Sequence, residues 1–181
     1  MGRIRIFAGP NGSGKTTLNS ELKRSYNLGY YINADDLYKK VKEELFFDFS
    51  DYNLTPSLLS IKAFASQHGL FSKLPIGLSF KLQGSQAIFR GSPNVYEMAM
   101  IADYLRHSLL ETGETFSFET VFSHRAKISF IEEANKKGYR TYLYFVSTNS
   151  PDINIERIKQ RVEEGGHEVP ESKGVIVKSG V

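Results

Sequence analysis

The residues best suited to chemistry lie near the start of the chain, in a glycine-rich segment that ends in a lysine and a threonine. Gly9 to Thr16 reads Gly-Pro-Asn-Gly-Ser-Gly-Lys-Thr, which fits the phosphate-loop pattern G-x-x-x-x-G-K-T. Its glycines permit positive φ and a close approach of backbone N–H groups to phosphate oxygens. We expect Lys15 to reach the β- and γ-phosphates of ATP, and the Thr16 hydroxyl to coordinate the accompanying Mg²⁺.

The surroundings of this segment match what the motif requires. Residues 3–8 are rich in strand formers, and residues 17–23 place Leu18 and Leu22 four apart, as on one helix face. Strand, loop and helix in this order make the match specific. The residues expected to bind the nucleotide are Gly9, Asn11, Gly12, Ser13, Gly14, Lys15, Thr16 and Thr17.

Two carboxylates are candidates for the acid–base and metal-linked roles of phosphoryl transfer. Asp35 follows a short predicted strand at 29–33, and Glu119 ends a predicted strand at 115–119. In an open α/β sheet the edge outside the carboxyl ends of the strands faces the ligand, so both are expected to face the γ-phosphate. Either could serve as the base or as the metal-linked acid. The adjacent Asp36 is expected to be a helix N-cap.

Cations and imidazoles complete the set of candidate side chains. Arg157 and Arg161 are four apart in a helix predicted to begin at Pro151, so both face the same way and suit a lid over the transferred phosphoryl group. His124 and His167 are the best placed of the four histidines. No spacing of His, Asp and Glu predicts a dedicated metal site, so Mg²⁺ is expected to arrive with ATP.

Strand and helix patterns alternate along the chain, which predicts the α/β class with a mostly parallel sheet and helices on both faces, as in the P-loop NTPase fold. The remaining predicted elements are helices at 37–45, 95–110 and 126–137 and a strand at 139–146. Residues 46–93 break into short pieces, with a helix within 54–65 and a hairpin strand at 76–82. We interpret 46–93 as an insertion that either covers the substrate site or packs against the core.

Composition narrows the class of protein. The 181 residues are 40% hydrophobic and 24% charged, which fits one globular domain spanning 1–181. The absence of cysteine excludes disulfides and thiolate chemistry. No apolar run approaches the roughly 20 residues of a membrane span, and the charged N-terminus does not fit a signal peptide, so we expect a cytoplasmic protein without a membrane partner. The net charge is 23 − 20 = +3, and the sequence contains no dense block of Lys and Arg, which argues against a nucleic-acid partner.

Together these residues resemble the zeta-toxin family of P-loop kinases. Three blocks carry the resemblance: residues 9–17 with 33–37, residues 116–124, and residues 139–170. The last block ends in Arg-Val-Glu-Glu-Gly-Gly-His-Glu-Val-Pro at 161–170, which is similar to the family's R-V-x-x-G-G-H-x-V-P signature. The resemblance implies an ATP-dependent kinase for the 3′-hydroxyl of the amino sugar in UDP-N-acetylglucosamine, and an antitoxin as partner.

On the family's pattern, Asp35 would be the base that activates the sugar hydroxyl. Glu119, Thr120 and His124 would bind the sugar nucleotide. Lys15 would hold ATP, and Arg157 and Arg161 would stabilise the transferring phosphoryl group.

The chain departs from the family's pattern at two places. The family continues past Val-Pro with an isoleucine and a helix containing Arg-Tyr, whereas residues 171–181 form a short apolar tail without arginine. We interpret this atypical tail as a truncation, a frameshifted end or a natural variant, and the insertion at 46–93 as a source of altered substrate choice. The alternatives are therefore a kinase for another small acceptor, such as a nucleotide or an antibiotic, and an ATP-binding protein with weakened catalysis.

Overall fold

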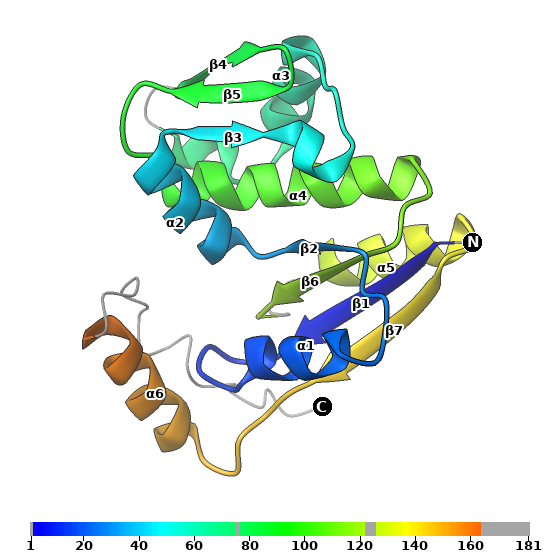
Figure 1. The fold of residues 1–181 in the computed structure, drawn as a ribbon, viewed down its shortest axis with the longest axis vertical. Coiled ribbons are helices and arrows are strands. Elements are labelled where there is room, and N and C mark those ends of the chain that lie inside the picture. Colours follow the sequence, from blue (N-terminus) through cyan, green and yellow to red (C-terminus); the bar gives the residue numbers. More distant parts are fainter. Residues whose placement is uncertain (1, 75–76, 122–125, 164–181) are drawn as a thin grey trace. The chain divides into compact units, whose positions relative to one another are not determined.

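The computed structural model describes residues 2–74, 77–121 and 126–163 (Figure 1). The chain forms two compact units. One holds Met1–Tyr31 together with the described residues from Thr115 on, and the other is Ile32–Glu114. The stretch 46–93 lies wholly within the second unit. In the part of the chain that is described, no helix is both long enough and apolar enough to cross a membrane.

The first unit is built on a four-stranded sheet with the order β2-β6-β1-β7. Its strands are β1 (Arg3–Ala8), β2 (Tyr30–Ile32), β6 (Phe116–Thr120) and β7 (Arg140–Phe145). Strand β1 pairs in parallel with β6 on one side and with β7 on the other. The described residues of this unit also form the helices α1 (Lys15–Lys23), α5 (Ala126–Lys136) and α6 (Pro151–Glu163). The predicted α/β class with a parallel sheet is therefore confirmed, and each predicted element of this unit is present within a few residues of its predicted bounds.

Helices α1 and α5 lie on opposite faces of this sheet (Figure 1). Phe118 of β6 contacts Phe130 of α5 with ring centroids 5.8 Å apart, which places α5 on the face that Phe118 shares with its neighbour Ile6 in β1. Because side chains alternate along a strand, Arg5 points to the other face. There Arg5 Nη1 donates to the carbonyl of Asn27 at 2.9 Å, and its guanidinium lies over Tyr26, both just after α1.

The second unit combines three α-helices with a small antiparallel sheet of the order β3-β5-β4. Its elements are α2 (Ala34–Glu44), β3 (Phe46–Asp48), the 3-10 turn η1 (Phe49–Tyr52), α3 (Leu58–Gln67), the 3-10 turn η2 (Phe71–Lys73), β4 (Phe80–Gln83), β5 (Gln86–Phe89) and α4 (Val95–Glu111). Helices α2 and α3 both pack on α4 (Figure 1). The core is formed by buried side chains of α4 at spacings of three and four, Met98, Ile101 and Leu105, together with Phe47 and Phe49.

The bounds of α4 show how local residues set a helix. Asn94 caps the start, because its side-chain oxygen accepts from the N–H of Tyr96 at 2.8 Å. At the other end Gly113 has φ 79°, and the N–H of Glu114 donates to the carbonyl of Leu109 at 3.1 Å, as in a Schellman motif. The helix predicted at 95–110 is therefore confirmed, with its end one residue later.

The sequence prediction was wrong at the start of α2. Asn33, and not Asp36, is the N-cap: its Oδ1 accepts from the N–H of Asp35 at 3.0 Å, so α2 begins at Ala34. Asp35 and Asp36 both lie in the first turn, where the positive end of the helix dipole favours acidic side chains. The strand before them ends at Ile32, so Asp35 is a residue of a helix and does not sit at a strand end.

The region 46–93 also differs from its prediction. The predicted helix within 54–65 is displaced to Leu58–Gln67, because Ser57 caps its start by accepting from the N–H of Ser60. The expected hairpin is present as β4 and β5 joined at Gly84 and Ser85, but strand β4 begins only at Phe80. Strand β3 was not predicted, because its three residues are too few to show an alternating pattern.

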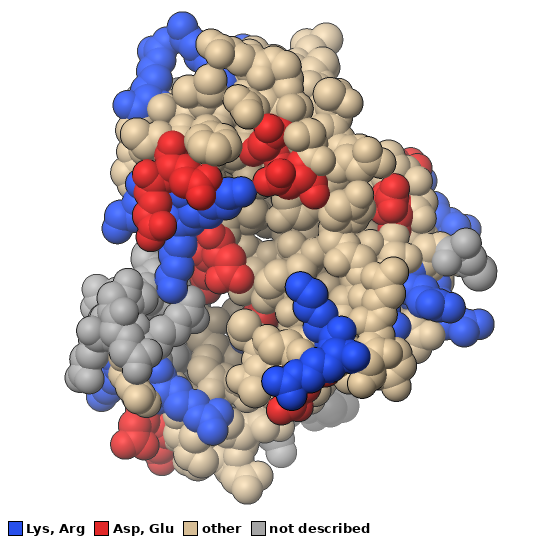
Figure 2. All heavy atoms as spheres, viewed as in Figure 1, with Lys and Arg blue, Asp and Glu red and all other residues tan. Residues whose placement is uncertain are grey.

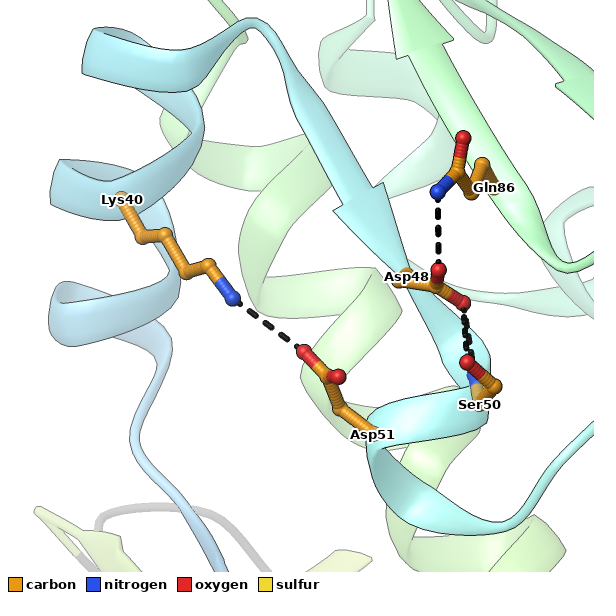
Figure 3. A network of polar contacts seen from close by, with 5 residues as sticks. All are labelled: Lys40, Asp48, Ser50, Asp51 and Gln86. Atoms are coloured by element: carbon orange, nitrogen blue, oxygen red, sulfur yellow. Dashed lines mark hydrogen bonds and ion pairs between the residues drawn. The ribbon is translucent and has the colours of Figure 1, made fainter.

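Asp48 is the centre of a polar network in this second unit (Figure 3). Its Oδ1 accepts from the N–H and the hydroxyl of Ser50 at 2.9 and 2.6 Å, and its Oδ2 accepts from Gln86 Nε2 at 2.9 Å. The hydrogen bond from the Ser50 hydroxyl is the largest cause that lowers the pKa of the Asp48 carboxyl well below its usual range, and Ser85 and Gln86 add to it. The network joins the end of β3 to β5 and to the first turn of η1.

A lowered folded-state pKa means that the ionised carboxylate of Asp48 stabilises the folded chain above the unfolded value, near pH 4. That stabilisation is lost as the pH falls from about 4 toward the folded pKa. We therefore expect the wild-type free energy of unfolding, measured by urea titration, to fall more steeply with acid below about pH 4 than that of Asp48→Asn. Ser50→Ala keeps the carboxylate but loses one donor, and should be intermediate. Equal slopes for wild type and Asp48→Asn would contradict this role.

Candidate functional site

The glycine-rich segment leaves the sheet of the first unit between two parallel strands. The N–H of Gly9 donates to the carbonyl of Thr120, the last residue of β6, at 3.2 Å. On the other side, the N–H of Val146 donates to the carbonyl of Ala8 at 2.7 Å. The segment therefore starts at the carboxyl edge of the sheet and leads directly into α1, which is the predicted order of strand, loop and helix.

Two of its glycines have no room for a side chain. Gly9 has φ 148°, and a Cβ there would lie 2.0 Å from the carbonyl oxygen of Val146. Gly12 has φ 76°, and a Cβ there would lie 2.6 Å from the carbonyl oxygen of Asn154 in α6. Both contacts are with main-chain atoms, so they cannot be relieved by a rotamer change. The loop is thereby pressed against β7 on one side and α6 on the other.

Lys15 folds back over the start of the loop. Its side chain is buried, and its Nζ donates to the carbonyls of Gly9 at 3.1 Å and Pro10 at 2.8 Å. A buried ammonium is costly unless hydrogen bonds or negative charge compensate it. The loop carbonyls thus hold a positive charge at the mouth of the loop. Ser13 is buried beside it, and its hydroxyl has no hydrogen-bond partner among the described residues.

The N-terminus of α1 adds to this positive character. Gly14, with φ 98°, occupies the N-cap position and brings no side-chain acceptor, and the first turn contains no acidic residue. The turn holds Lys15 and the exposed Thr16 and Thr17 instead, while Asn11 is half-buried in the loop. Helix N-termini carry backbone donors and a partial positive charge. A cation, helix-end donors and the absence of a nearby acid in the turn favour an anionic ligand.

Helix α6 contributes an arginine to the same place. Arg157 is exposed, and its Nη1 donates to the carbonyl of Gly12 at 3.3 Å. One helical turn earlier, Asn154 is buried and its Oδ1 accepts from the hydroxyl of Thr148 at 2.9 Å. The guanidinium of Arg157 is therefore carried by a helix whose backbone contacts the loop. Arg161 lies one turn further in α6, and its side chain lies outside the described part.

Sequence reasoning missed Asn154 and Thr148. Asn154 lies three residues before Arg157, so the two share a helix face, and this spacing was the available signal. Thr148 gave no signal, because its partner is six residues away across a turn.

Glu119 and Thr120 end β6 beside the loop. Thr120 joins the loop through its carbonyl, and Glu119 pairs in register with Phe7 of β1. Both are half-buried. The hydroxyl of Tyr31, on β2, donates to Glu119 Oε1 at 2.5 Å, a contact that the sequence did not predict. His124 and His167, also expected near the site, lie outside the described residues.

Asp35 belongs to the second unit, whereas the loop belongs to the first. It is half-buried in the first turn of α2. In the same unit, burial raises the pKa of the Tyr52 hydroxyl to about 12, and the carboxylates of Asp51 and Asp36 add to the rise. Among the described residues there is no group of three or more His, Cys, Asp or Glu that could hold a metal ion.

Comparison with known proteins gives distant likenesses. No family model matches the chain. An uncharacterised protein of Haemophilus influenzae is 23% identical over 166 residues, which are 92% of this chain and 85% of that protein.

Two solved structures resemble the chain in fold at 15% identity. One is described as a "putative kinase" from Chloroflexus aurantiacus, with a TM-score of 0.52 over 94% of this chain and 74% of that one. The other belongs to the Pnkp1/Rnl/Hen1 RNA repair complex, with a TM-score of 0.52 over 96% of this chain. This chain spans 42% of the length of the RNA repair chain. The chain therefore shares an α/β fold with these two structures.

The close approach of Gly12 to α6 can be tested by matched alanine substitutions. Gly12→Ala and Gly14→Ala both place a side chain at positive φ, which costs about 1–2 kcal/mol. A Cβ at Gly14 meets nothing within 4 Å, whereas one at Gly12 must displace the backbone of α6. We expect Gly12→Ala to lose about 1–3 kcal/mol more in the free energy of unfolding. Amide exchange in α6 should rise with Gly12→Ala alone, and equal effects of the two variants would rule out this contact.

Proposed function

We propose that this chain is a P-loop kinase that transfers the γ-phosphate of ATP to a hydroxyl of a small acceptor. The observation that carries the proposal is the loop Gly9–Thr16 at the carboxyl edge of a parallel sheet, with Lys15 folded over it and Arg157 bonded to it. The fold shared with a structure described as a kinase supports the same class of reaction.

The loop suits a nucleoside triphosphate bound together with Mg²⁺. A Cβ at Gly9 or Gly12 would collide with backbone atoms, so both positions lack a side chain. The main-chain N–H groups of the loop therefore stay accessible to an anion. The buried hydroxyl of Ser13 without a partner is one donor for a phosphate oxygen. We assign ATP to Gly9, Asn11, Gly12, Ser13, Gly14, Lys15, Thr16 and Thr17, and Mg²⁺ to the exposed hydroxyl of Thr16. When bound, Mg²⁺ neutralises negative charge on the phosphates.

The cations of the site stabilise the negative charge of the phosphate groups. Lys15 holds the β- and γ-phosphates from the loop side, exchanging carbonyl partners for phosphate oxygens. Arg157, and Arg161 on the same helix, stabilise the three equatorial oxygens of the transferring group. Since Gly12 fixes α6 against the loop, Arg157 needs only a side-chain movement to exchange the Gly12 carbonyl for a phosphate oxygen.

Transfer forms one bond and breaks another. The acceptor oxygen bonds to the γ-phosphorus, and the bond from that phosphorus to the bridging oxygen of ADP breaks. Asp35 accepts the proton that the acceptor hydroxyl releases. The resemblance to zeta toxins assigns this role to Asp35, which lies in the first turn of α2. Its backbone N–H is held by the Asn33 side chain, which fixes the start of the helix.

For the acceptor we propose a sugar nucleotide of the UDP-N-acetylglucosamine type, as the resemblance to zeta toxins implies. Glu119, Thr120 and His124 would contact it, and an antitoxin protein would follow from the same resemblance. The cytoplasmic location expected from the sequence pattern is part of the same proposal. On the face seen in Figure 2, Lys and Arg are interspersed with Asp and Glu, which supports a small acceptor over a nucleic acid. Another small acceptor, or ATP binding with weakened catalysis, are the competing outcomes.

Acceptor identity is tested with ATP, Mg²⁺ and a panel of UDP-N-acetylglucosamine, nucleosides and aminoglycosides, with products read by mass spectrometry. A phosphorylated sugar nucleotide is the expected product. A phosphorylated nucleoside or aminoglycoside would keep the kinase and replace the acceptor. Binding of ATP without ADP formation under any acceptor would reduce the chain to an ATP-binding protein.

Lys15→Ala should lower kcat by at least about 10²-fold, because it removes the cation that neutralises developing phosphate charge. Lys23→Ala is the matched control: Lys23 is an exposed lysine at the other end of α1, and the control should keep wild-type kcat. Steady-state ADP release measures both. Near-normal turnover by Lys15→Ala would refute the loop as the nucleotide site.

Asp35→Asn should bind ATP with unchanged Kd and lower kcat by about 10²- to 10⁴-fold, because the amide cannot accept the proton. Asp36→Asn changes the next residue, which is exposed in the same helical turn, and should keep wild-type transfer. ATP binding by calorimetry and transfer by single-turnover assay separate the two effects. Equal transfer by both variants would remove Asp35 as the base.

A further inference from the structure

We infer that Tyr31 is a positioning residue of the acceptor site, which acts by holding the carboxylate of Glu119 toward an acceptor hydroxyl. This inference rests on the proposed kinase function and adds a residue to it. The observation is the hydrogen bond of 2.5 Å from the Tyr31 hydroxyl to Glu119 Oε1. The two residues are far apart in sequence, on strands β2 and β6, which are neighbours in the sheet of the first unit.

The place of this pair in the fold points to the reaction. Glu119 is followed by Thr120, whose carbonyl accepts from the N–H of Gly9 at the start of the glycine-rich loop. Glu119 therefore directly precedes the residue that is hydrogen-bonded to the loop, at the carboxyl edge of the sheet. It points to the same face as Phe7, its partner in register, and so to the α1 face of the sheet, where the loop enters its helix.

Glu119 differs from the residues before it in β6 in both charge and burial. The residues before it in β6, Phe116, Ser117 and Phe118, are fully or almost fully buried, and Glu119 is the only charged residue of β6. A carboxylate that loses part of its hydration on folding is compensated by an ion pair or by hydrogen bonds. Among the described residues, Glu119 has no ion pair, and its hydrogen bond comes from a neutral phenol. Such a carboxylate keeps accepting capacity for a neutral donor.

The second oxygen, Oε2, supplies that capacity. A carboxylate with one oxygen fixed by a phenol has its plane and its second oxygen fixed as well. Oε2 is therefore the acceptor that the pair presents, and it matches a hydroxyl donor such as those of a sugar ring. The ligand class is a neutral sugar ring, held beside the phosphate loop.

The test removes one oxygen atom from Tyr31, so that the effect of its hydrogen bond is measured while the packing of the ring is kept. Tyr31→Phe keeps the ring and deletes the donor, and Glu119→Gln keeps the shape and deletes the charge. Tyr144→Phe is the matched control, because its ring stacks on Phe7 on the same face and no hydrogen bond of its hydroxyl is present among the described residues. Each variant is assayed with ATP, Mg²⁺ and UDP-N-acetylglucosamine, or with the acceptor of the panel that wild type phosphorylates.

We expect Tyr31→Phe to raise the acceptor KM about 3- to 10-fold, the loss of one hydrogen bond, with the KM for ATP and the melting temperature unchanged. The double variant of Tyr31→Phe with Glu119→Gln should lose no more than Glu119→Gln alone, because Tyr31 acts through that carboxylate. Tyr144→Phe should match wild type.

The outcomes distinguish the two claims. No transfer by wild type to any acceptor of the panel overturns the proposed function and this inference with it. Transfer by wild type with an unchanged acceptor KM in Tyr31→Phe overturns the inference alone. Additive losses in the double variant, or equal increases of the two KM values in Tyr31→Phe, overturn it as well, since they show an independent or merely structural role.

Discussion

Two backbone hydrogen bonds at the end of β1 are the constraint on which the site depends. The Gly9 N–H donates to the last residue of β6, and the Ala8 carbonyl accepts from the residue that follows β7, so the chain leaves the sheet at a fixed point between two parallel strands. Everything that follows takes its position from this exit: the turn of the loop, the start of α1 and the direction of Lys15. Parallel strands end at the same edge, and that is why Glu119 and the residues after β7 reach the same place as the loop.

Much of the first unit could be predicted because its signals are local or repeat at a short period. The glycine–lysine motif predicts its own loop conformation and the start of α1. Apolar strands such as 140–145 are recognisable by composition. The pairing order of the strands was not readable, since it depends on contacts between segments more than 100 residues apart in sequence, such as Ile4 with Phe116.

The failures also have physical causes. Asn33, Asp35 and Asp36 are all able to cap a helix, and the sequence cannot rank them, because the cap is chosen by where the preceding strand ends. The Tyr31–Glu119 and Thr148–Asn154 contacts depend on tertiary geometry, and single side chains of these types occur throughout the chain. In the second unit, the Asp48 network joins β5 to β3, the strand that the sequence did not predict.

The contact between Gly12 and Asn154 has a consequence for how the sequence can vary. The atom that a Cβ at position 12 would meet is a main-chain oxygen, which every amino acid carries. No replacement of Asn154 can make room, so a change at position 12 has no compensating partner in the helix. Position 12 is therefore expected to be invariant on its own and not to covary with position 154, although the two backbones are in contact. A search for contacts by correlated substitution would miss the place where the loop and α6 are most tightly joined.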